Sequence, residues 1–190
     1  DSDRSDKDWS KIGGNFNFLS FGEFPQTNVE PDSLFFPQGV ILGGGEVKNV
    51  ELSKIAEHVR HSWYDGSTAR HPSAGETLPN YTELNTSDRY NWLKAPRYQG
   101  EPMEVGPLAR MLVGYVRGRT KFVDAVDDFL DHTNLTSAAL FSTLGRTAAR
   151  CLETKIIADA MGGWLNELNA GGNTLSSWTM PSQASGMGLN

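Results

Sequence analysis

The stretch "RYQGEPMEVGPLARMLVGY", Arg97–Tyr115, marks the change from a turn-rich region to a helical one. Pro107 suits the first position of a helix, because the N–H that proline lacks would have no intrahelical partner there. The apolar residues that follow recur at i, i+3, i+4 and i+7, which is the spacing of one helix face. The stretch therefore predicts a helix from about Gly106 onward. Its buried face is formed by Leu108, Met111, Leu112 and Tyr115.

Two further helices are predicted after this one. Thr120 can cap the second helix, because a threonine side chain accepts a hydrogen bond from a free N–H of the first turn. The third helix runs from about Thr136 to Leu168, and Gly162-Gly163 weakens it by about 1 kcal/mol per glycine, so we expect a bend or a close neighbour there. The predicted apolar faces are Phe122, Val123, Val126, Phe129 and Leu130 in the second helix, and Leu140, Leu144, Ala148, Cys151, Leu152, Ile157, Met161, Trp164 and Leu168 in the third.

The region before Arg97 indicates strands and an ordered loop. "NFNFLSFGEFP", residues 15–25, alternates phenylalanine with small or polar residues and predicts one strand that Pro25 ends. "LFFPQGVILGGGEVKNVEL", residues 34–52, predicts two short strands joined by a hairpin turn at Gly43-Gly44-Gly45. A short helix is expected at Leu52–Arg60. Residues 62–100 show no sustained helix or strand period. We nevertheless expect an ordered loop, because the segment has too many aromatic residues for a flexible linker. Five of them are Trp63, Tyr64, Tyr81, Tyr90 and Trp92.

This order of elements predicts the α+β class, with a small β-rich N-terminal part followed by three main helices. Residues 1–14 are charged, end in Gly13-Gly14, and are expected to form a flexible terminus. Residues 15–100 form the β-rich region with its aromatic loop, and residues 101–190 form the helical region. We expect both regions to lie within one domain, because 190 residues match the length of a single large domain.

The composition excludes several classes of partner. The net charge is −6, from 17 basic and 23 acidic residues, so the chain is not expected to bind nucleic acid. No apolar run reaches the roughly 18 residues of a membrane helix, and the charged N-terminal sequence does not resemble a signal peptide. We therefore expect the chain to associate with a membrane only through partners.

The residue types that usually form metal or nucleophilic sites are sparse. Cys151 is the single cysteine and is expected to pack in the core as a small apolar residue. His58 and His61 are three positions apart (i, i+3) on the short predicted helix, with Glu57 beside them. This spacing fits two ligands of one metal, but a solvated helix end explains it better. The residues alone indicate no catalytic group and no metal ligand.

Other patterns have structural explanations. Gly43-Gly44-Gly45 lacks the Lys-Ser/Thr of a phosphate loop and favours a hairpin turn. No Gly-x-Ser-x-Gly sequence supports a serine nucleophile. Chance matches explain the Asn-x-Ser/Thr sequences at Asn80, Asn85 and Asn134. The acidic residues of the second helix lie opposite its apolar stripe and are expected to face solvent. They are Asp124, Asp127, Asp128 and Asp131.

Glu104 and Arg110 flank the "VGPLA" sequence and are the remaining candidates for a site. Glu104 precedes the helix and can act as a cap or as a partner of the helix dipole. Arg110 lies in the first turn and can pair with Glu104 through folding of the turn, or with another subunit. From the residues alone, both are interpreted as structural.

Several motifs together resemble the large subunit of nickel-iron hydrogenases of the membrane-bound uptake type. Besides the opening stretch they are "HSWY" at 61–64, "YNWLKAPRYQG" at 90–100, "STLGRTAAR" at 142–150 and "SGMGLN" at 185–190, and the resemblance covers roughly residues 15–190. In that family the large subunit is nearly three times as long and carries two Cys-x-x-Cys pairs, neither of which is present here. The chain resembles a middle-to-late segment, and it ends before the Ala-Pro-Arg-Gly segment of the family.

The resemblance implies reversible heterolytic oxidation of H2 at a nickel-iron centre with cyanide and carbonyl ligands. It also implies that residues outside this chain ligate the centre, so that these 190 residues alone are inactive. An iron-sulfur small subunit is the implied electron acceptor, in a bacterial assembly on the periplasmic side of the membrane, with the cytoplasm as the alternative. Glu104 and Arg110 would support the fold near the centre, and the aromatic loop would pack against the rest of the large subunit.

Two other functions remain open from the sequence. The chain can be a metal-free scaffold or binding module derived from such a subunit, without activity of its own. A metal enzyme that uses His58 and His61 would need a third ligand that the sequence does not indicate.

Overall fold

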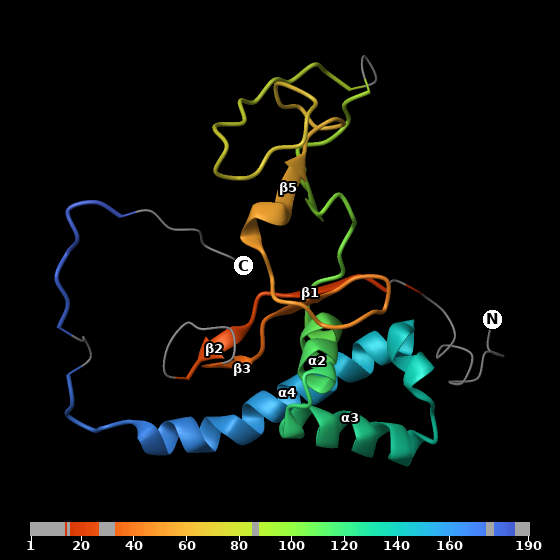
Figure 1. Ribbon diagram of the computed structural model, residues 1–190, viewed down its shortest axis with the longest axis vertical. Coiled ribbons are helices and arrows are strands. Elements are labelled where there is room, and N and C mark those ends of the chain that lie inside the picture. The colour runs from red at the N-terminus through yellow and green to blue at the C-terminus, as the bar shows by residue number, and fades with distance from the viewer. Residues whose placement is uncertain (1–13, 15, 27–32, 85–87, 174–176, 185–190) are drawn as a thin grey trace.

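The computed structural model describes residues 14, 16–26, 33–84, 88–173 and 177–184, and its fold is the predicted α+β class. The expected flexible terminus, residues 1–14, lies outside the described residues except for Gly14, as do Asn85 and the "SGMGLN" sequence. Along the chain the strands come first and the three α-helices afterwards (Figure 1). They are β1 (Phe18–Ser20), β2 (Glu23–Pro25), β3 (Leu34–Phe36), β4 (Gly39–Ile41), the 3-10 helix η2 (Leu52–Lys54), β5 (Ile55–His58), β6 (Ala95–Tyr98), α2 (Pro107–Val116), α3 (Thr120–Thr133), the 3-10 helix η3 (Ser137–Phe141) and α4 (Thr143–Glu167).

The strands form three antiparallel pairs: β1 with β4, β2 with β3, and β5 with β6. The single strand predicted for residues 15–25 is wrong, because the chain turns at Gly22 (φ 86°) and β1 and β2 pair with different strands. The hairpin turn at Gly43–Gly45 is confirmed. Beyond it, Val40 and Lys48 exchange two backbone hydrogen bonds of 2.9 Å, so the second predicted strand is reduced to one bridge.

The helix predicted at Leu52–Arg60 is wrong. Residues 52–54 form a single 3-10 turn, and the next four residues are strand β5. Strand β5 pairs in register with β6, so that Ile55 lies opposite Tyr98 and His58 opposite Ala95. The pairing partner lies about 40 residues further along the chain, and pairing with it outweighs the local preference for a helix.

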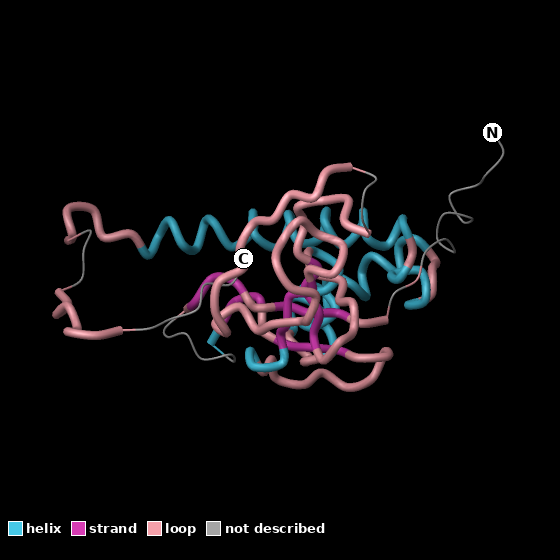
Figure 2. Tube along the Cα trace, turned by 90° about the horizontal axis from the view of Figure 1, so that it is seen from above, coloured by secondary structure: helices cyan, strands magenta, loops and turns pink. Residues whose placement is uncertain are grey.

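Helix α2 lies at the centre of the molecule. It packs against β1 on one side and against α3 and α4 on the other (Figures 1 and 2). Gly106, at a φ of 103° that favours glycine, turns the chain into the helix ahead of Pro107, as the opening stretch predicts. More of α2 is buried than the predicted single face, because elements cover it from both sides. Its buried residues are Leu108, Ala109, Met111, Leu112, Val113 and Gly114.

Helices α3 and α4 differ from the prediction at their N-terminal ends. Thr120 is the first helical residue of α3 and not its cap, because Arg119 occupies the cap position and no side chain caps this end. The third predicted helix is divided at Ser142 into η3 and α4. Helix α4 continues through Gly162-Gly163, where a methyl group added to either glycine would meet no atom within 4 Å, so no close neighbour lies there among the described residues.

The buried face of α4 coincides only in part with the predicted stripe. The fully buried residues of α4 are Gly145, Ala149 and Ile156, while the predicted Leu152 and Ile157 are partly buried against the core. Cys151 is exposed, which contradicts its predicted place in the core. It follows Ala149 by two positions, about 200° around the helix, and therefore lies on the opposite side from the packed face. Leu168 and Met161 are likewise exposed, since this half of α4 extends past the core (Figure 1).

The long segment between β5 and β6 is ordered by many internal hydrogen bonds. The Trp63 and Asn91 backbones are joined at 2.9 Å, and the Asn80 N–H donates to the Trp63 carbonyl at 2.8 Å. The Arg89 guanidinium donates to the carbonyls of Tyr64 and Gly66. The segment extends away from the helices (Figure 1). In the part of the chain that the structure describes, no helix is both long and apolar enough to cross a membrane.

We predict that the contact between α2 and α3 is sensitive to one added methyl group. A Cβ at Gly114 would stand 2.5 Å from the buried ring of Phe122, so Gly114→Ala should lower the free energy of unfolding by about 1–3 kcal/mol. Gly162→Ala is the matched control on an exposed helix surface, and it should raise that free energy by up to about 1 kcal/mol. Urea unfolding of both variants tests this, and equal effects would contradict the packing described here.

Candidate functional site

Glu104 is held where the strands meet the helices. Its backbone continues the edge of β1: the Leu19 N–H donates to the Glu104 carbonyl at 2.9 Å, and the Glu104 N–H donates to the Asn17 carbonyl at 2.8 Å. Three residues later the chain enters α2 at Pro107. Because two hydrogen bonds fix this backbone, the Glu104 side chain projects from a defined position toward α4.

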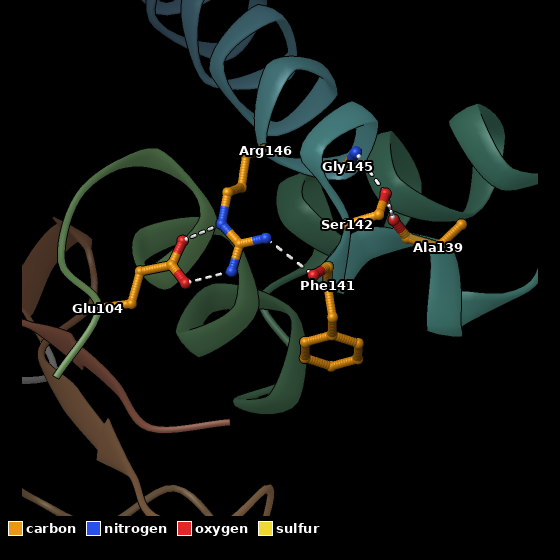
Figure 3. A network of polar contacts seen from close by, with 6 residues as sticks. All are labelled: Glu104, Ala139, Phe141, Ser142, Gly145 and Arg146. Atoms are coloured by element: carbon orange, nitrogen blue, oxygen red, sulfur yellow. Dashed lines mark hydrogen bonds and ion pairs between the residues drawn. The ribbon is translucent and has the colours of Figure 1, made fainter. Parts of the chain in front are cut away.

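The Glu104 carboxylate forms a two-point ion pair with Arg146 in the first turn of α4 (Figure 3). Arg146 Nε donates to Oε1 at 2.7 Å and Nη2 donates to Oε2 at 2.5 Å. The third guanidinium nitrogen, Nη1, donates to the Phe141 carbonyl at 2.8 Å. This fork geometry is the strongest form of ion pair between side chains, and it joins the strand edge to η3 and to α4.

Ser142 fixes the start of α4 beside this pair (Figure 3). The Ser142 hydroxyl is buried, accepts from the Gly145 N–H at 3.1 Å and donates to the Ala139 carbonyl at 2.6 Å. Gly145 is required here, because a Cβ would stand only 2.3 Å from the Leu140 carbonyl oxygen. The sharp turn from η3 into α4 therefore fixes the direction in which the Arg146 side chain points toward Glu104.

Arg110 and Glu153 form a second two-point pair, between α2 and α4. Arg110 Nε donates to Oε1 at 2.9 Å and Nη2 donates to Oε2 at 3.1 Å. The pairing of Arg110 with Glu104 through the turn, one of the two partners considered for it, does not occur. Each instead bonds a residue of α4, and these residues, Arg146 and Glu153, are seven positions apart and so lie on one face of that helix.

Burial sets these two pairs apart from the surface pairs of the same helix. Both inner pairs are partly buried: Glu104 and Arg146 are 18% and 32% exposed, and Glu153 and Arg110 are 12% and 24% exposed. Lys155 and Asp159 are 69% and 65% exposed. Exposed pairs contribute little to stability, whereas removal of one member of a buried pair leaves a charge without its partner. The two ion pairs can hold the loop before α2, α2 itself and α4 rigidly together. The charged groups of both pairs are engaged with each other, so the arrangement indicates a structural role.

Arg146, Glu153 and Ser142 were not found by sequence reasoning. Arg146 and Ser142 lie within the "STLGRTAAR" motif, whose Ser-x-x-Gly spacing was an available sign of a capped helix start. Glu104 and Arg110 follow one another as a negative and then a positive charge, whereas Arg146 and Glu153, two helical turns apart, follow as a positive and then a negative charge. This complementary order of charges was the available sign of the two pairs.

The histidine pair does not have the geometry that a shared metal needs. His58 ends strand β5, and His61 lies beyond it, stacked on Tyr90 with ring centroids 5.7 Å apart. His61 Nδ1 is 3.0 Å from the Asp88 carbonyl oxygen. The predicted helical spacing of the two imidazoles is therefore wrong.

Two of the concave regions of the described chain contain several charged side chains. A cavity of about 340 Å³ beside β5 is lined in part by Lys94, Arg70 and His71. Lys94 Nζ pairs with Glu57 at 3.4 Å, Arg70 donates to the Glu76 carbonyl at 3.3 Å, and His71 Nε2 lies 3.0 Å from the Leu52 carbonyl.

The second concave region is a groove of about 760 Å³ between α3 and α4. The aspartates predicted to be solvated, Asp124, Asp127, Asp128 and Asp131, are exposed and line this groove. The hydrogen bond to the Asp128 carbonyl and the charge of the Asp128 carboxylate raise the pKa of His132 above its usual 6.5. The hydrogen bond from Tyr115 to Asp127 raises the pKa of that tyrosine.

Within the described ranges no three histidine, cysteine, aspartate or glutamate side chains are grouped so that they could hold a metal ion. The one cysteine of the chain is exposed on α4 and has no second thiol to act with. The described residues therefore do not fit a nickel-iron centre as its ligands, and we assign no step of a reaction through such a centre to them.

Comparison with known proteins identifies relatives of this arrangement. Residues 4–190 match the sequence family described as "Nickel-dependent hydrogenase". The chain is 37% identical over 220 residues to the uptake hydrogenase large subunit of Bradyrhizobium diazoefficiens, covering 96% of the chain and 37% of that relative. It is 39% identical over 189 residues to the corresponding subunit of Rhizobium leguminosarum bv. viciae, covering 86% of the chain and 32% of the relative.

The fold also matches solved structures. The Ni-Fe-Se hydrogenase from D. vulgaris Hildenborough in the reduced state is 34% identical, with a TM-score of 0.72, over 93% of this chain and 37% of that one. The chain thus spans about a third of the length of the relatives it matches.

We predict that Glu104 and Arg146 are energetically coupled. Glu104→Gln and Arg146→Gln should each lower the free energy of unfolding by about 1–3 kcal/mol, because each leaves a partly buried charge without its partner. The double variant should lose less than the sum, with a coupling energy of about 0.5–3 kcal/mol. Urea unfolding of all three variants measures this. The exposed pair Lys155–Asp159 is the control and should show no measurable coupling, and additive effects at Glu104 and Arg146 would contradict the pairing.

The Ser142 cap gives a separate prediction. Ser142→Ala removes the acceptor for the Gly145 N–H and should lower the free energy of unfolding by about 0.5–2 kcal/mol. Thr147→Ala, on the exposed side of the same helix, should change it by less than about 0.5 kcal/mol. Thermal unfolding followed by circular dichroism compares the two, and an equal loss in both variants would show that Ser142 has no capping role.

Proposed function

The chain belongs to the nickel-dependent hydrogenase family, and on this premise we propose that it serves as a segment of the large subunit of an uptake hydrogenase that oxidises H2 reversibly to protons and electrons. The observation that carries the proposal is the agreement of sequence and fold over nearly the whole chain with hydrogenase large subunits. The chemistry of H2 cleavage would come from a nickel-iron centre with cyanide and carbonyl ligands in the complete subunit. Since the described residues offer no ligand set for that centre, its ligands would lie outside this chain.

The role that we propose for this chain is mechanical support. The Glu104–Arg146 and Arg110–Glu153 pairs hold the loop before α2, α2 itself and α4 in one arrangement. Catalytic sites require such rigid surroundings, because small displacements of positioned groups reduce rates strongly. Glu104 and Arg110 would then act through the position of α2 and α4, without contact with the substrate.

The partners follow from the same proposal. Electrons would pass to an iron-sulfur small subunit, and the remaining segments of the large subunit would pack on this chain. The relatives are uptake hydrogenase large subunits of bacteria. We propose an assembly that meets the membrane through its partners on the periplasmic side, with the cytoplasm as the alternative.

A second candidate is a metal-free scaffold or binding module derived from such a subunit. It is favoured by the lack of a metal-binding cluster among the described residues. In addition, Cys151 is exposed and is the single cysteine of the chain.

We predict that the chain, purified from its native source without added metal, contains nickel in nearly stoichiometric amount together with iron and a second, iron-sulfur polypeptide. The reason is that the segments that carry the nickel ligands would remain bound to this chain during purification. Plasma mass spectrometry gives nickel and iron per copy of the chain, and peptide mass spectrometry identifies the companion. Nickel at background would reject the hydrogenase role and favour the scaffold.

His58→Ala is the matched control for the metal analysis. Since His58 lies in strand β5 away from any group of ligands among the described residues, the nickel content should not change. A parallel loss of nickel in the variant would instead support a histidine-based metal site.

A further inference from the structure

Helices α3 and α4 lie against one another (Figure 1) and enclose a groove of about 760 Å³, which we call the α3–α4 groove. Each helix contributes an alanine to its lining, Ala125 and Ala160, and these short side chains leave the space open. Ile156 and Leu152 of α4 line the same groove. Ile156 is 6% exposed, and Leu152 packs partly buried against the core. The groove therefore has an apolar floor that the core holds in place.

Acidic side chains surround this floor. Five aspartates and two lysines line the groove, which gives its lining a net charge of −3. Four of the aspartates recur on α3 at i, i+3, i+4 and i+7, so they follow one side of that helix over about 10 Å. The fifth belongs to α4. The aspartates are Asp124, Asp127, Asp128, Asp131 and Asp159, and the lysines are Lys121 and Lys155.

The two lysines leave much of this negative charge without compensation. Lys155 Nζ is 2.6 Å from the Asp159 carboxylate, and Lys121 Nζ lies 4.8 Å from the centroid of the Phe35 ring. The Asp124 carboxylate forms no hydrogen bond or ion pair with any residue that the structure describes. Asp124 is also exposed, so a cation from outside the chain can reach it. The groove thus combines an apolar floor with carboxylates that are open to an external cation.

The charge of the groove excludes several occupants. A second copy of the chain carries the same net charge of −6, and nucleic acid or an acidic membrane surface would be repelled as well. Among the described residues, the aspartates are not grouped as ligands of a metal ion. A purely apolar segment would bury carboxylates without partners, which costs free energy. The remaining occupant is a ligand with an apolar face and positive charges beside it.

We propose that the α3–α4 groove binds a basic amphipathic helix of a separate partner protein. Apolar side chains on one face of this helix would lie on Leu152 and Ile156, and its lysines or arginines would pair with the aspartates of α3. Helices of this kind dock in apolar grooves through residues spaced at i, i+3, i+4 and i+7, which is also the spacing of the aspartates along α3. Complementary charges select such a partner and speed its association. The inference goes beyond the proposed function and does not depend on it.

The test measures binding of a defined peptide to the native assembly that contains this chain. The probe is a fluorescently labelled peptide of two Leu-Lys-Lys-Leu-Leu-Lys-Leu repeats, which can form a basic amphipathic helix, and fluorescence anisotropy gives its Kd. One control peptide has glutamate in place of every lysine, and another has serine in place of every leucine. We expect the basic amphipathic peptide to bind much more tightly than either control, and its binding should weaken as the salt concentration rises.

Variants of the groove locate the binding site. Asp124→Asn combined with Asp131→Asn removes two exposed charges and should weaken binding of the basic peptide about 2- to 30-fold. Glu46→Gln, which removes an exposed charge outside the groove, should leave the binding unchanged. Ala160→Phe should prevent binding, because the added ring occupies the space of the peptide side chains. Ala158→Phe, on the exposed side of α4, is its matched control.

Unchanged circular dichroism shows that a variant assembly is intact, and if Ala160→Phe does not assemble, the aspartate variant decides the test. Binding that the groove variants do not weaken would overturn the inference, as would equally tight binding of the serine peptide. The absence of any binding would overturn it too, and this is the result expected if another segment of the large subunit or a second subunit covers the groove. Nickel content measured on the same samples reports on the proposed function separately.

Discussion

The pairing of the Glu104 carboxylate with the Arg146 guanidinium is the interaction on which the arrangement of this chain depends. Glu104 is bonded through its backbone to the strand edge, and Arg146 is bonded to the Phe141 carbonyl at the turn into α4. The pair thus joins elements that are 42 residues apart in sequence. With the Arg110–Glu153 pair two helical turns further on, it fixes α4 against both the loop and α2. A single pair would leave rotation about the contact free, whereas two pairs on one helix face do not.

Much of the helical part could be predicted, because its signals are local. Pro107 and the apolar spacing after it place α2 correctly, and the apolar face of α3 is largely buried. The predictions of secondary structure and of buried faces fail where contacts between residues far apart in sequence determine them. Residues 55–58 form a strand because their partner is Ala95–Tyr98. The core covers only part of the predicted stripe of α4, and Cys151 lies on the exposed side because the elements that pack against α4 contact the face of Gly145, Ala149 and Ile156.

The candidate site shows the same division. Glu104 and Arg110 were recognisable as charges beside a helix start. Their partners lie about 40 residues away on α4, and only the complementary order of the charges at 146 and 153 indicates the pairing. The family match supplies the functional assignment that the residues alone do not indicate. The structure adds the two partly buried ion pairs and the exposed aromatic and apolar side chains. Under the proposed function, these features belong to one segment of a larger metalloprotein whose metal ligands lie in other segments.

The most direct test of this account is X-ray diffraction from crystals of the native assembly, recorded at the nickel absorption edge to locate the metal. The account predicts a nickel peak whose bonded atoms all come from residues outside this chain, with the Glu104–Arg146 pair intact and away from the metal. A nickel peak within bonding distance of Cys151, of His58 or of any other side chain of residues 1–190 would contradict it.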